Sequence, residues 1–305
     1  MSPASTEVAT EGQPRRRPRS DLRLALVMIA PAVLGLGIFL IWPTLHGIAL
    51  SFTDFNLLTP PTWHGLNNYL RMLEDPVFWN AAWVTLYYVV VNIGVQTVLA
   101  LVIAVLMHRL TRSTIVRSLV LTPYLVSNVV AALVFFWILD TQLGLGNQIL
   151  AGMGLERIPF LADDATVIPT IALINVWRHV GYTALLIFAG LQTIPESAYE
   201  AARVDGASEW QTFWRITIPL LRPILALVLI MTIIGSFQVF DTVAVTTAGG
   251  PVNSSRVLQF YIYNMAFGQF QFGYASALSV GLLVILVIIT VLQYRLTRAG
   301  ETDLN

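Results

Sequence analysis

The chain has 305 residues, of which 56% are hydrophobic and only 11% are charged, and its formal net charge is zero. A soluble protein carries roughly 25% charged residues, so this composition indicates a membrane protein, and the lack of a basic domain argues against nucleic-acid binding. The sequence contains neither cysteine nor lysine, which excludes disulfides, thiolate metal sites and a P-loop ATPase on this chain.

Residues 1–22 are rich in proline, serine, threonine and arginine, and we expect them to form a disordered cytoplasmic tail. An arginine cluster followed by an apolar run is also typical of a signal peptide. Here the apolar run continues from about Leu24 through Ile41 and beyond, which is too long for a signal peptide. Residues 23–80 are therefore expected to hold a retained first transmembrane helix and an extracellular segment.

Six apolar segments are each near the ~20 residues that a helix needs to cross the hydrocarbon core of a bilayer. They are Leu24–Leu50, Ala81–Met107, Ser118–Leu139, Thr166–Leu191, Ile218–Val243 and Ala275–Leu292. The sequence thus predicts an all-α polytopic membrane protein with six transmembrane helices. We expect residues 81–295 to form the core, with five of these helices, and residues 296–305 to form a second cytoplasmic tail.

The arginines predict the orientation of the helices, because positive charge accumulates on the cytoplasmic side. Thirteen of the seventeen lie in the two tails, in the link after the second span, or in the loop after the fourth span and its exit. Only Arg71, Arg157 and Arg256 fall on the other side, and Arg178 lies inside the fourth span. We therefore expect both termini in the cytoplasm and residues 246–274 outside.

The fourth span carries polar residues near its middle, where ionisable groups are costly and usually face a cavity, a partner or the bundle interior. Asn175, Arg178, His179 and Tyr182 recur at helical spacing and so share one side of the helix. Two interpretations remain open. These residues form either a hydrogen-bond network between helices or a polar wall for a hydroxyl-rich solute.

The outer half of the fifth span combines aromatic residues with an amide and a carboxylate, in Phe237, Gln238, Phe240 and Asp241. Aromatic faces and a few polar groups suit a sugar-like solute, so this mixture fits a solute pathway. Packing explains the phenylalanines equally well, and Asp241 can simply cap a helix. Polar residues of the second and third spans are expected to hydrogen-bond between helices; they are Asn92, Gln96, Ser127 and Asn128.

A polar loop at about residues 192–218 separates the fourth and fifth spans. Ser197 and Glu200 have the spacing of a capping box, which predicts that a short helix begins there. Gly206 suits the left-handed conformation that ends such a helix. The loop therefore begins with a short helix and a defined break.

A second capping box, Ser208 with Gln211, predicts a second short helix in this loop. Its aromatic residues lie on one face; they are Trp210, Phe213 and Trp214. Pro219 marks the start of a further helix, because its missing N–H costs least in a first turn. The sequence predicts two short helices at one membrane surface, with an aromatic stripe that needs a partner.

The pattern E-A-A, three residues, G, then I-x-x-P resembles the loop of the integral-membrane permeases of ATP-binding-cassette (ABC) importers. The matching residues are Glu200, Ala201, Ala202, Asp205, Gly206, Ala207, Phe213, Ile216 and Pro219, with Pro223 after them. The resemblance implies that Glu200 meets a basic residue of the ATPase while both short helices, with Trp210 and Trp214, sit in a cleft of the ATPase. Helix capping by Glu200 and insertion of the aromatic stripe into the lipid interface remain alternatives.

Further segments resemble the carbohydrate group of these permeases, of the type found in maltose, lactose, trehalose and glycerol-3-phosphate importers. Trp63–Tyr69 and Thr247–Pro251 are similar to its G-L-x-N-Y and T-x-G-G-P segments. The fourth span resembles the one whose Asn, a Gly four residues on, and Tyr line the sugar site of the maltose importer. Asn175 and Tyr182 match, but His179 replaces the Gly, so we expect a different geometry at the substrate.

The resemblance implies a non-catalytic permease subunit in a bacterial cell membrane that carries a sugar or related solute, from an oligosaccharide to a glycerol-3-phosphate-like compound. The implied partners are a sister permease, an ABC ATPase dimer, an extracellular solute-binding protein and membrane lipid. ATP and Mg belong to the ATPase, and this chain is expected to bind no cofactor, metal or nucleic acid. A stand-alone secondary transporter or channel is the rival class, but it does not explain the E-A-A pattern. An intramembrane enzyme lacks any recognisable nucleophile or metal motif.

Overall fold

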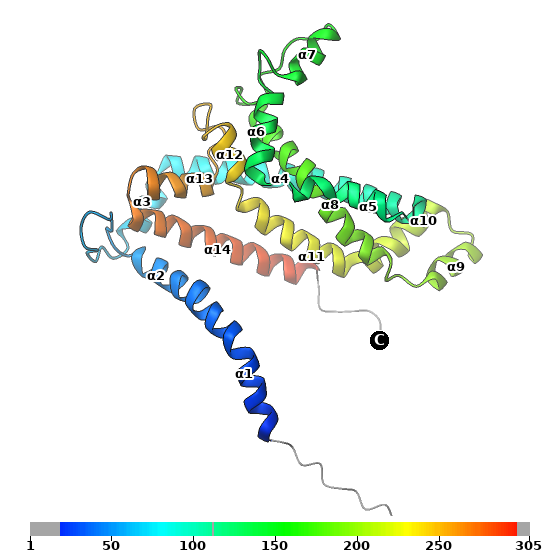
Figure 1. The fold of residues 1–305 in the computed structure, drawn as a ribbon, viewed down its shortest axis with the longest axis horizontal. Coiled ribbons are helices and arrows are strands. Elements are labelled where there is room, and N and C mark those ends of the chain that lie inside the picture. The colour runs from blue at the N-terminus through cyan, green and yellow to red at the C-terminus, as the bar shows by residue number, and fades with distance from the viewer. Residues whose placement is uncertain (1–18, 112, 298–305) are drawn as a thin grey trace, which may run out of the picture. The chain divides into compact units, whose positions relative to one another are not determined.

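The computed structural model describes residues 19–111 and 113–297 (Figure 1). Most of the two predicted tails, 1–22 and 296–305, lies outside these residues, as do Arg15, Arg16, Arg17, Arg112 and Arg298. The regular elements of the described chain are helices, and strand pairing there is limited to one isolated bridge between Thr53 and Trp63. The predicted all-α class is confirmed. The chain divides into one unit that ends at Ala49 and a second that starts at Leu50.

The first unit is built from a single apolar helical run. It comprises α1 (Arg19–Leu36), the π-helical turn η1 (Gly37–Ile41) and α2 (Trp42–Leu50), whose last residue begins the second unit. Residues Leu24–Leu50 are long and apolar enough to cross a membrane, which agrees with the first predicted span.

The second unit contains four further helical runs of membrane-spanning length, Pro76–Leu110, Val167–Leu191, Glu209–Thr246 and Phe272–Arg295. They correspond to α4 (Pro76–Leu110), α8 (Val167–Leu191), the run through α11 (Ile218–Phe237) and α14 (Phe272–Thr297). The helix α4 begins earlier than predicted, at Pro76. Its start is fixed by Asp75, whose carboxylate accepts a hydrogen bond from the Val77 N–H, and by proline in the first turn.

The third predicted span is not one helix. It consists of α5 (Thr114–Leu125) and α6 (Asn128–Ile138), which meet at an angle of 87°. Pro123 in the last turn of α5 cannot donate a backbone hydrogen bond, and Val126 and Ser127 have extended backbone. The prediction of a continuous helix over Ser118–Leu139 was therefore wrong, although the two helices together have the length of a span.

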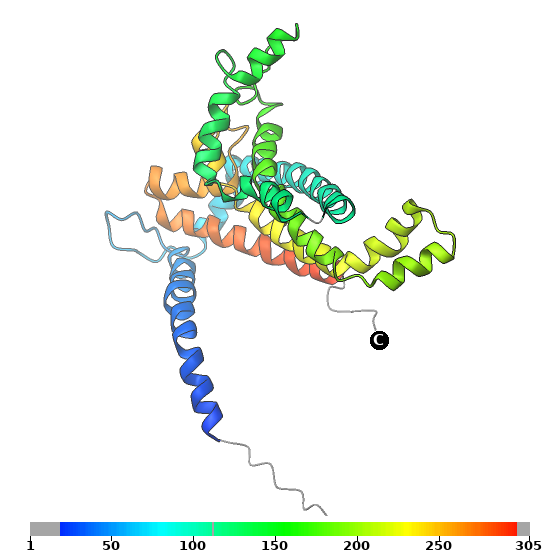
Figure 2. The ribbon, with the colours of Figure 1, turned by 45° about the vertical axis from the view of Figure 1, so that its right-hand side comes forward.

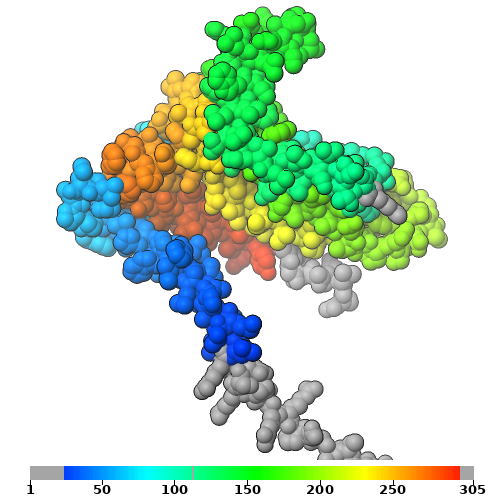
Figure 3. All heavy atoms as spheres, in the orientation of Figure 1, coloured from blue at the N-terminus to red at the C-terminus, as the bar shows by residue number. Residues whose placement is uncertain are grey.

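Shorter helices occupy the links between the spans. They are α3 (Asn67–Glu74), α7 (Leu145–Gly152), α9 (Glu196–Val204), α10 (Glu209–Thr212), η2 (Phe213–Thr217), α12 (Asp241–Thr246), α13 (Leu258–Tyr263) and η3 (Asn264–Gly268). Figures 1 and 2 show α9 and α10 together at one end of the second unit, which we call the loop end, and α3 and α13 at the opposite end, which we call the α3 end. The segment that carries α7 projects away from the body of this unit, as the green spheres of Figure 3 show.

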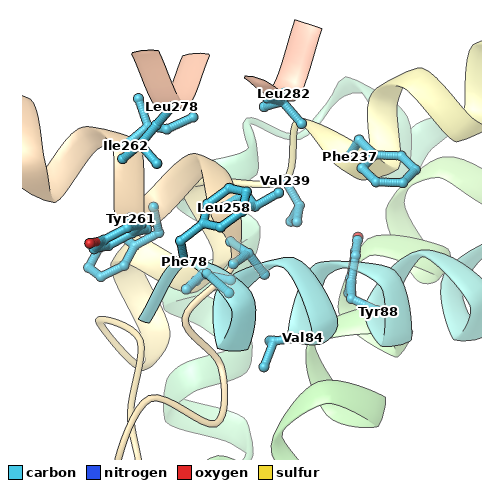
Figure 4. Packing of buried hydrophobic residues seen from close by; sticks show 14 of the residues in the cluster. Phe78, Val84, Tyr88, Phe237, Val239, Leu258, Tyr261, Ile262, Leu278 and Leu282 are labelled. Carbon is cyan, nitrogen blue, oxygen red and sulfur yellow. The ribbon is translucent and has the colours of Figure 1, made fainter. Parts of the chain in front are cut away.

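Two apolar cores hold the second unit together. The core at the α3 end includes Phe78 and Val84 of α4, Leu258 of α13 and Leu278 of α14 (Figure 4). At the loop end, α4 packs against α8 and α11 around residues that include Ala100, Ala104, Ile187, Leu191 and Leu221. The small side chains of α4 allow the helices to approach closely, as is common in membranes. Between the two cores the lining of the bundle becomes polar.

Candidate functional site: a polar cavity and an exposed loop

A cavity of about 290 Å³ lies in the second unit between the two cores. The sequence predicted that Asn175, Arg178, His179 and Tyr182 share one side of the fourth span, and all four line this cavity. The segment after α11 adds three of the predicted residues of the fifth span, Gln238, Phe240 and Asp241. The structure therefore brings together polar residues that the sequence had placed on two separate spans.

Phe237 is the exception among the residues predicted to line a pathway. Its side chain is buried in the core at the α3 end and is not part of the cavity lining. The last turn of α11 directs Phe237 into the core, while Gln238 and Phe240 follow the end of the helix and face the cavity. The packing interpretation fits Phe237, and the pathway interpretation fits the position of Phe240.

Arg178 stabilises the break in the third span. Its Nε donates to the carbonyl oxygen of Val126 at 2.7 Å, and its Nη2 donates to that of Tyr124 at 3.2 Å. Both carbonyls lie where α5 ends, so they lack the partners that a continuous helix supplies. Unpaired backbone groups are expensive at membrane depth. One guanidinium of α8 thus supplies the hydrogen bonds that the break requires.

His179 is held on both ring nitrogens. Its Nδ1 lies 2.9 Å from the carbonyl oxygen of Asn175, which can only accept, so Nδ1 carries the proton. Its Nε2 then accepts a hydrogen bond from Nη1 of Arg178 at 2.8 Å. Beside this pair, the ring of Tyr124 stacks on Tyr182 with centroids 4.6 Å apart. The polar residues of the fourth span therefore form an internal network and a cavity wall at the same time.

The amides of the second span join three helices. Asn92 donates to Gln96 at 3.2 Å and to Ser236 of α11 at 2.9 Å, and Gln96 donates to Thr183 of α8 at 2.8 Å. The prediction that Asn92 and Gln96 hydrogen-bond between helices is confirmed. Their second property, that they line the cavity, was missed. Their spacing of four residues, which places both on one face, was the available signal.

Asn128 links the start of α6 to α12. Its Nδ2 donates to a carboxylate oxygen of Asp241 at 2.9 Å, which confirms the predicted contact between helices for Asn128. Ser127 precedes α6 without a side-chain capping bond. Asp241 is the first residue of α12 rather than its cap, which is Phe240. The simple capping interpretation of Asp241 is therefore wrong, because its carboxylate faces Asn128 and the cavity.

The first short helix of the loop, α9, does not use the predicted capping box. The helix starts at Glu196 after Pro195, so Ser197 already lies inside the first turn and forms no capping bond with Glu200. The break at Gly206 agrees with the prediction. Its φ is +70°, and the Ala207 N–H donates to the carbonyl of Ala202 at 2.9 Å, as in a Schellman ending.

The second short helix, α10, has the predicted capping box. The Ser208 hydroxyl accepts from the Gln211 N–H, and the Gln211 side chain accepts from the Ser208 N–H at 2.8 Å. Pro219 does not begin a separate helix, because α10, η2 and α11 continue without interruption from Glu209 to Phe237. The widened π-helical turn η2 ends at Thr217, two residues before Pro219, and accommodates a residue that has no N–H to donate.

The surface of the loop is apolar and aromatic. Val204, Trp210 and Trp214 are 87%, 70% and 50% exposed, and the rings of Trp210 and Trp214 contact each other and the half-buried Phe213. Ala201, Asp205 and Gly206 of the E-A-A pattern are also exposed, whereas Ala202 is buried. The predicted aromatic stripe exists and remains open to a partner.

Glu200 is exposed and accepts no hydrogen bond or ion pair from any residue in the described part of the chain. The neighbouring Glu209, in contrast, forms an ion pair with Arg109 of α4 at 2.6 Å. A second cavity, of about 840 Å³, lies behind the loop and is lined by residues of α4, α8, α9 and α10. The loop is thus tied to the helix bundle through Glu209, while the carboxylate of Glu200 faces outward.

At the α3 end, Asp75 accepts hydrogen bonds from two tyrosine hydroxyls. Tyr261 and Tyr274 both donate to one of its oxygens, Tyr274 at 2.6 Å. Partial burial opposes ionisation of Asp75, but these hydrogen bonds prevail and hold the pKa of its carboxyl below the usual value. Burial, reinforced by Asp75, raises the pKa of Tyr261. The cluster ties α4 to α13 and α14.

The segment that resembles G-L-x-N-Y has a structural role at the same end. The buried Asn68 donates to the carbonyls of Ser51 and Thr53 at 2.9 and 2.8 Å, and the hydroxyls of Ser51 and Tyr69 lie 2.6 Å apart. These bonds fix the link between the first span and α3. Among the described residues, no group of three or more His, Asp or Glu side chains is arranged to hold a metal ion.

Comparison with known proteins identifies the family. Residues 96–299 match the family model of the binding-protein-dependent transport system inner membrane component. The chain belongs to this family. The match includes the loop and the cavity-lining segments from Gln96 onward, and this permease therefore has the type of fold and the place in an ABC importer that its E-A-A pattern suggested.

Curated relatives match this permease over nearly its whole length. It is 34% identical to the probable ABC transporter permease protein YurN of Bacillus subtilis, over 91% of this chain and 97% of the relative. It is 32% identical to the trehalose/maltose transport system permease protein MalF of Thermococcus litoralis, over 91% and 95%. It is also 32% identical to the sulfoquinovosyl glycerol transport system permease protein SmoG of Agrobacterium fabrum, over 92% of this chain and 92% of the relative.

Solved structures share the fold. A bacterial ABC transporter involved in the import of the acidic polysaccharide alginate superposes with a TM-score of 0.79, at 24% sequence identity, over 92% of this permease and 97% of that chain. The alginate transporter in complex with a periplasmic protein that holds an alginate pentasaccharide gives a TM-score of 0.81 at 23% identity. The type I permease fold is thus confirmed.

Proposed function

We propose that this permease forms half of the translocation pathway for a sugar or related polyhydroxylated solute. The other half belongs to a sister permease, and a solute-binding protein outside the cell delivers the solute. The cavity between the two cores supports this proposal, because it combines tyrosine rings with amides, as sites for hydroxyl-rich ligands do. Relatives named for sugar transport support the same class of solute.

In this proposal the loop couples the permease to a dimer of ATPase subunits, which bind ATP and Mg. The observation that carries the proposal is the continuous helix from Glu209 to Phe237. Its first turns bear the exposed Trp210 and Trp214, and the residues after its end line the cavity. A force applied by a partner at the aromatic surface therefore reaches the cavity wall through one helix.

Glu200 is the residue that we expect to meet a basic group of the ATPase. It caps nothing in the structure, so its carboxylate is available for a charge-assisted hydrogen bond, which is roughly twice as strong as a neutral one. Glu200→Gln keeps the shape and removes the charge. Glu196→Gln, on the same helix and equally exposed, is the matched control.

The test measures attachment of the ATPase and binding-protein-stimulated ATP hydrolysis in purified complexes. Glu200→Gln is expected to weaken attachment or to uncouple hydrolysis from transport, and Glu196→Gln is expected to behave like the wild type. Gly206→Val should impair both, because a β-branched residue resists a φ of +70°. If Glu200→Gln transports and hydrolyses normally, the coupling role of Glu200 is wrong.

We further infer that the loop end faces the cytoplasm and that residues 246–274 lie outside. The arginine distribution supports this orientation, with thirteen on the loop side and three on the other. A reporter fused after Gly250 should behave as an extracytoplasmic domain. A cytosolic signal from that fusion contradicts the orientation.

A further inference from the structure

The cavity behind the loop, of about 840 Å³, lies where the second and fourth spans end. His108 and Arg109 line it from the last turn of α4, and Leu191 lines it from the last residue of α8. Both helices are long and apolar enough to cross a membrane. The cavity is therefore expected at the level where the spans leave the hydrocarbon core and meet the lipid head groups.

The lining of this cavity carries more positive than negative charge. Its charged residues are Arg109, Arg117, Arg203, Glu196 and Glu209, and the ion pair of Arg109 with Glu209 neutralises one charge of each sign. Glu196 and Arg203 are seven residues apart on α9, which separates their backbones by roughly 10 Å. Neither of them, nor Arg117, forms an ion pair with any residue that the structure describes. Two guanidinium groups thus lack an anionic partner.

Arg117 of α5 is fixed in position but has no acceptor. Its Cζ lies 4.3 Å from the centre of the Phe188 ring of α8. This contact attracts the charge, but the ring offers the guanidinium no lone pair to accept a hydrogen bond. Nε is buried without a partner, so the donors that can meet a ligand are those of the two Nη atoms. A half-buried cation without a partner is costly, and an anion in the cavity that it lines would offset this cost.

The helix α9 adds a second cation and a hydroxyl. Tyr199 and Arg203 are four residues apart, so they share the face of α9 that lines the cavity. The Tyr199 hydroxyl lies 3.4 Å from that of Thr217, which is longer than a usual O–H···O hydrogen bond. It can therefore turn to a stronger acceptor. Guanidinium groups together with a hydroxyl are the donors that phosphate oxygens require.

We propose that this cavity binds a phosphate-bearing anion, whose oxygens accept hydrogen bonds from Arg117, Arg203 and Tyr199. The anion joins α5, one half of the broken third span, to α9, the first short helix of the loop, and so orders the loop against the bundle. This site is separate from the cavity between the two cores and from Glu200, and it does not depend on which solute is carried. The phosphate belongs either to the head group of an anionic lipid or to a soluble compound.

The test measures amide hydrogen exchange of α9 in the purified permease–ATPase complex, held without nucleotide in nanodiscs of phosphatidylcholine. One arm replaces about a third of this lipid by phosphatidylglycerol, and the other adds millimolar inorganic phosphate against chloride of equal ionic strength. At ten times the half-maximal phosphate concentration, exchange is expected to slow by up to roughly tenfold. Slowing by phosphatidylglycerol alone assigns the site to a lipid head group, and slowing by inorganic phosphate assigns it to a soluble compound. Unchanged exchange in both arms overturns the proposal.

Variants then locate the effect. Arg117→Gln and Arg203→Gln are each expected to raise the half-maximal phosphate concentration at least roughly tenfold, or to remove the slowing by phosphatidylglycerol, because each loses charge-assisted hydrogen bonds. Arg215→Gln is the matched control, since Arg215 is exposed on η2 and does not line the cavity. Equal slowing in the wild type and in all three variants overturns the proposed site. Arg203 is exposed, so its variant keeps the test decisive even where Arg117→Gln fails to assemble.

Discussion

At Gly181, α8 lies against the backbone of α5, and a single methyl group there should separate the two helices. A Cβ atom at Gly181 would stand 1.9 Å from the carbonyl oxygen of Val120 and 2.8 Å from its carbon. A carbon and an oxygen approach to about 3.3 Å at best, so the helices would have to shift by roughly 1.4 Å. Overpacking costs typically about 1–3 kcal/mol, and the upper part of that range applies because the obstacle is backbone.

The displacement would also reach the cavity, since α5 carries the carbonyl of Tyr124 that Arg178 binds. Melting of the purified complex with and without sugar measures both effects. Gly181→Ala is expected to lower the melting temperature and to weaken the sugar response. The control is Gly94→Ala in α4, where nothing lies within 4 Å of the new Cβ, and where alanine should stabilise the helix by about 0.5–1 kcal/mol. If the two variants melt alike, the close approach at Gly181 does not exist.

Three further predictions concern the α3 end and the loop end of the second unit. The lowered pKa of Asp75 means that its contribution to stability is complete above the ordinary value of about 4 and is lost as the pH falls through the lower folded value; Asp75→Asn should cost roughly 1.5–3 kcal/mol and should remove this acid dependence from a melting series. Reversing the charge of Arg109 or of Glu209 alone should lower stability, and exchanging the two charges should restore most of the lost stability. The coupling energy in a double-mutant cycle should be roughly 0.2–1 kcal/mol, because both side chains are exposed. A coupling energy of zero contradicts an ion pair between them. Ser208→Ala should destabilise α10 by about 1 kcal/mol and increase amide exchange there, whereas Ser197→Ala should change stability little. A larger loss of stability from Ser197→Ala than from Ser208→Ala would instead support a capping box at Ser197 and Glu200.

The loop between the fourth and fifth spans was the part that the sequence predicted best. The second capping box and the left-handed Gly206 depend only on neighbours within a few residues, so the sequence contains all the information that they need. The first box failed because two starts compete in the same turn. Pro195 and Glu196 begin the helix before Ser197, and spacing alone does not reveal which start is used.

The cavity could be predicted only in part, because its geometry depends on contacts between distant segments. The polar face of the fourth span was visible in its periodicity. The bend between α5 and α6 was not, since Pro123 within a span is compatible with a mild kink as well as with an angle of 87°. Asn92 and Gln96 were recognised as polar contacts, but their place on the cavity wall depends on how α4 meets α8 and α11.

The break in the third span and Arg178 of the fourth span provide hydrogen-bond partners for each other. A helix interrupted at membrane depth leaves carbonyl oxygens without partners, and an arginine at that depth has N–H groups without partners; each alone costs several kcal/mol. In this permease the carbonyls of Tyr124 and Val126 and the guanidinium of Arg178 pair with one another. A charged residue inside a membrane span usually indicates a solute site, and Arg178 does stand on the cavity wall. Its Nε and Nη2 atoms, however, donate to backbone carbonyls, so the break in the third span accounts for the position of Arg178 without an anionic solute.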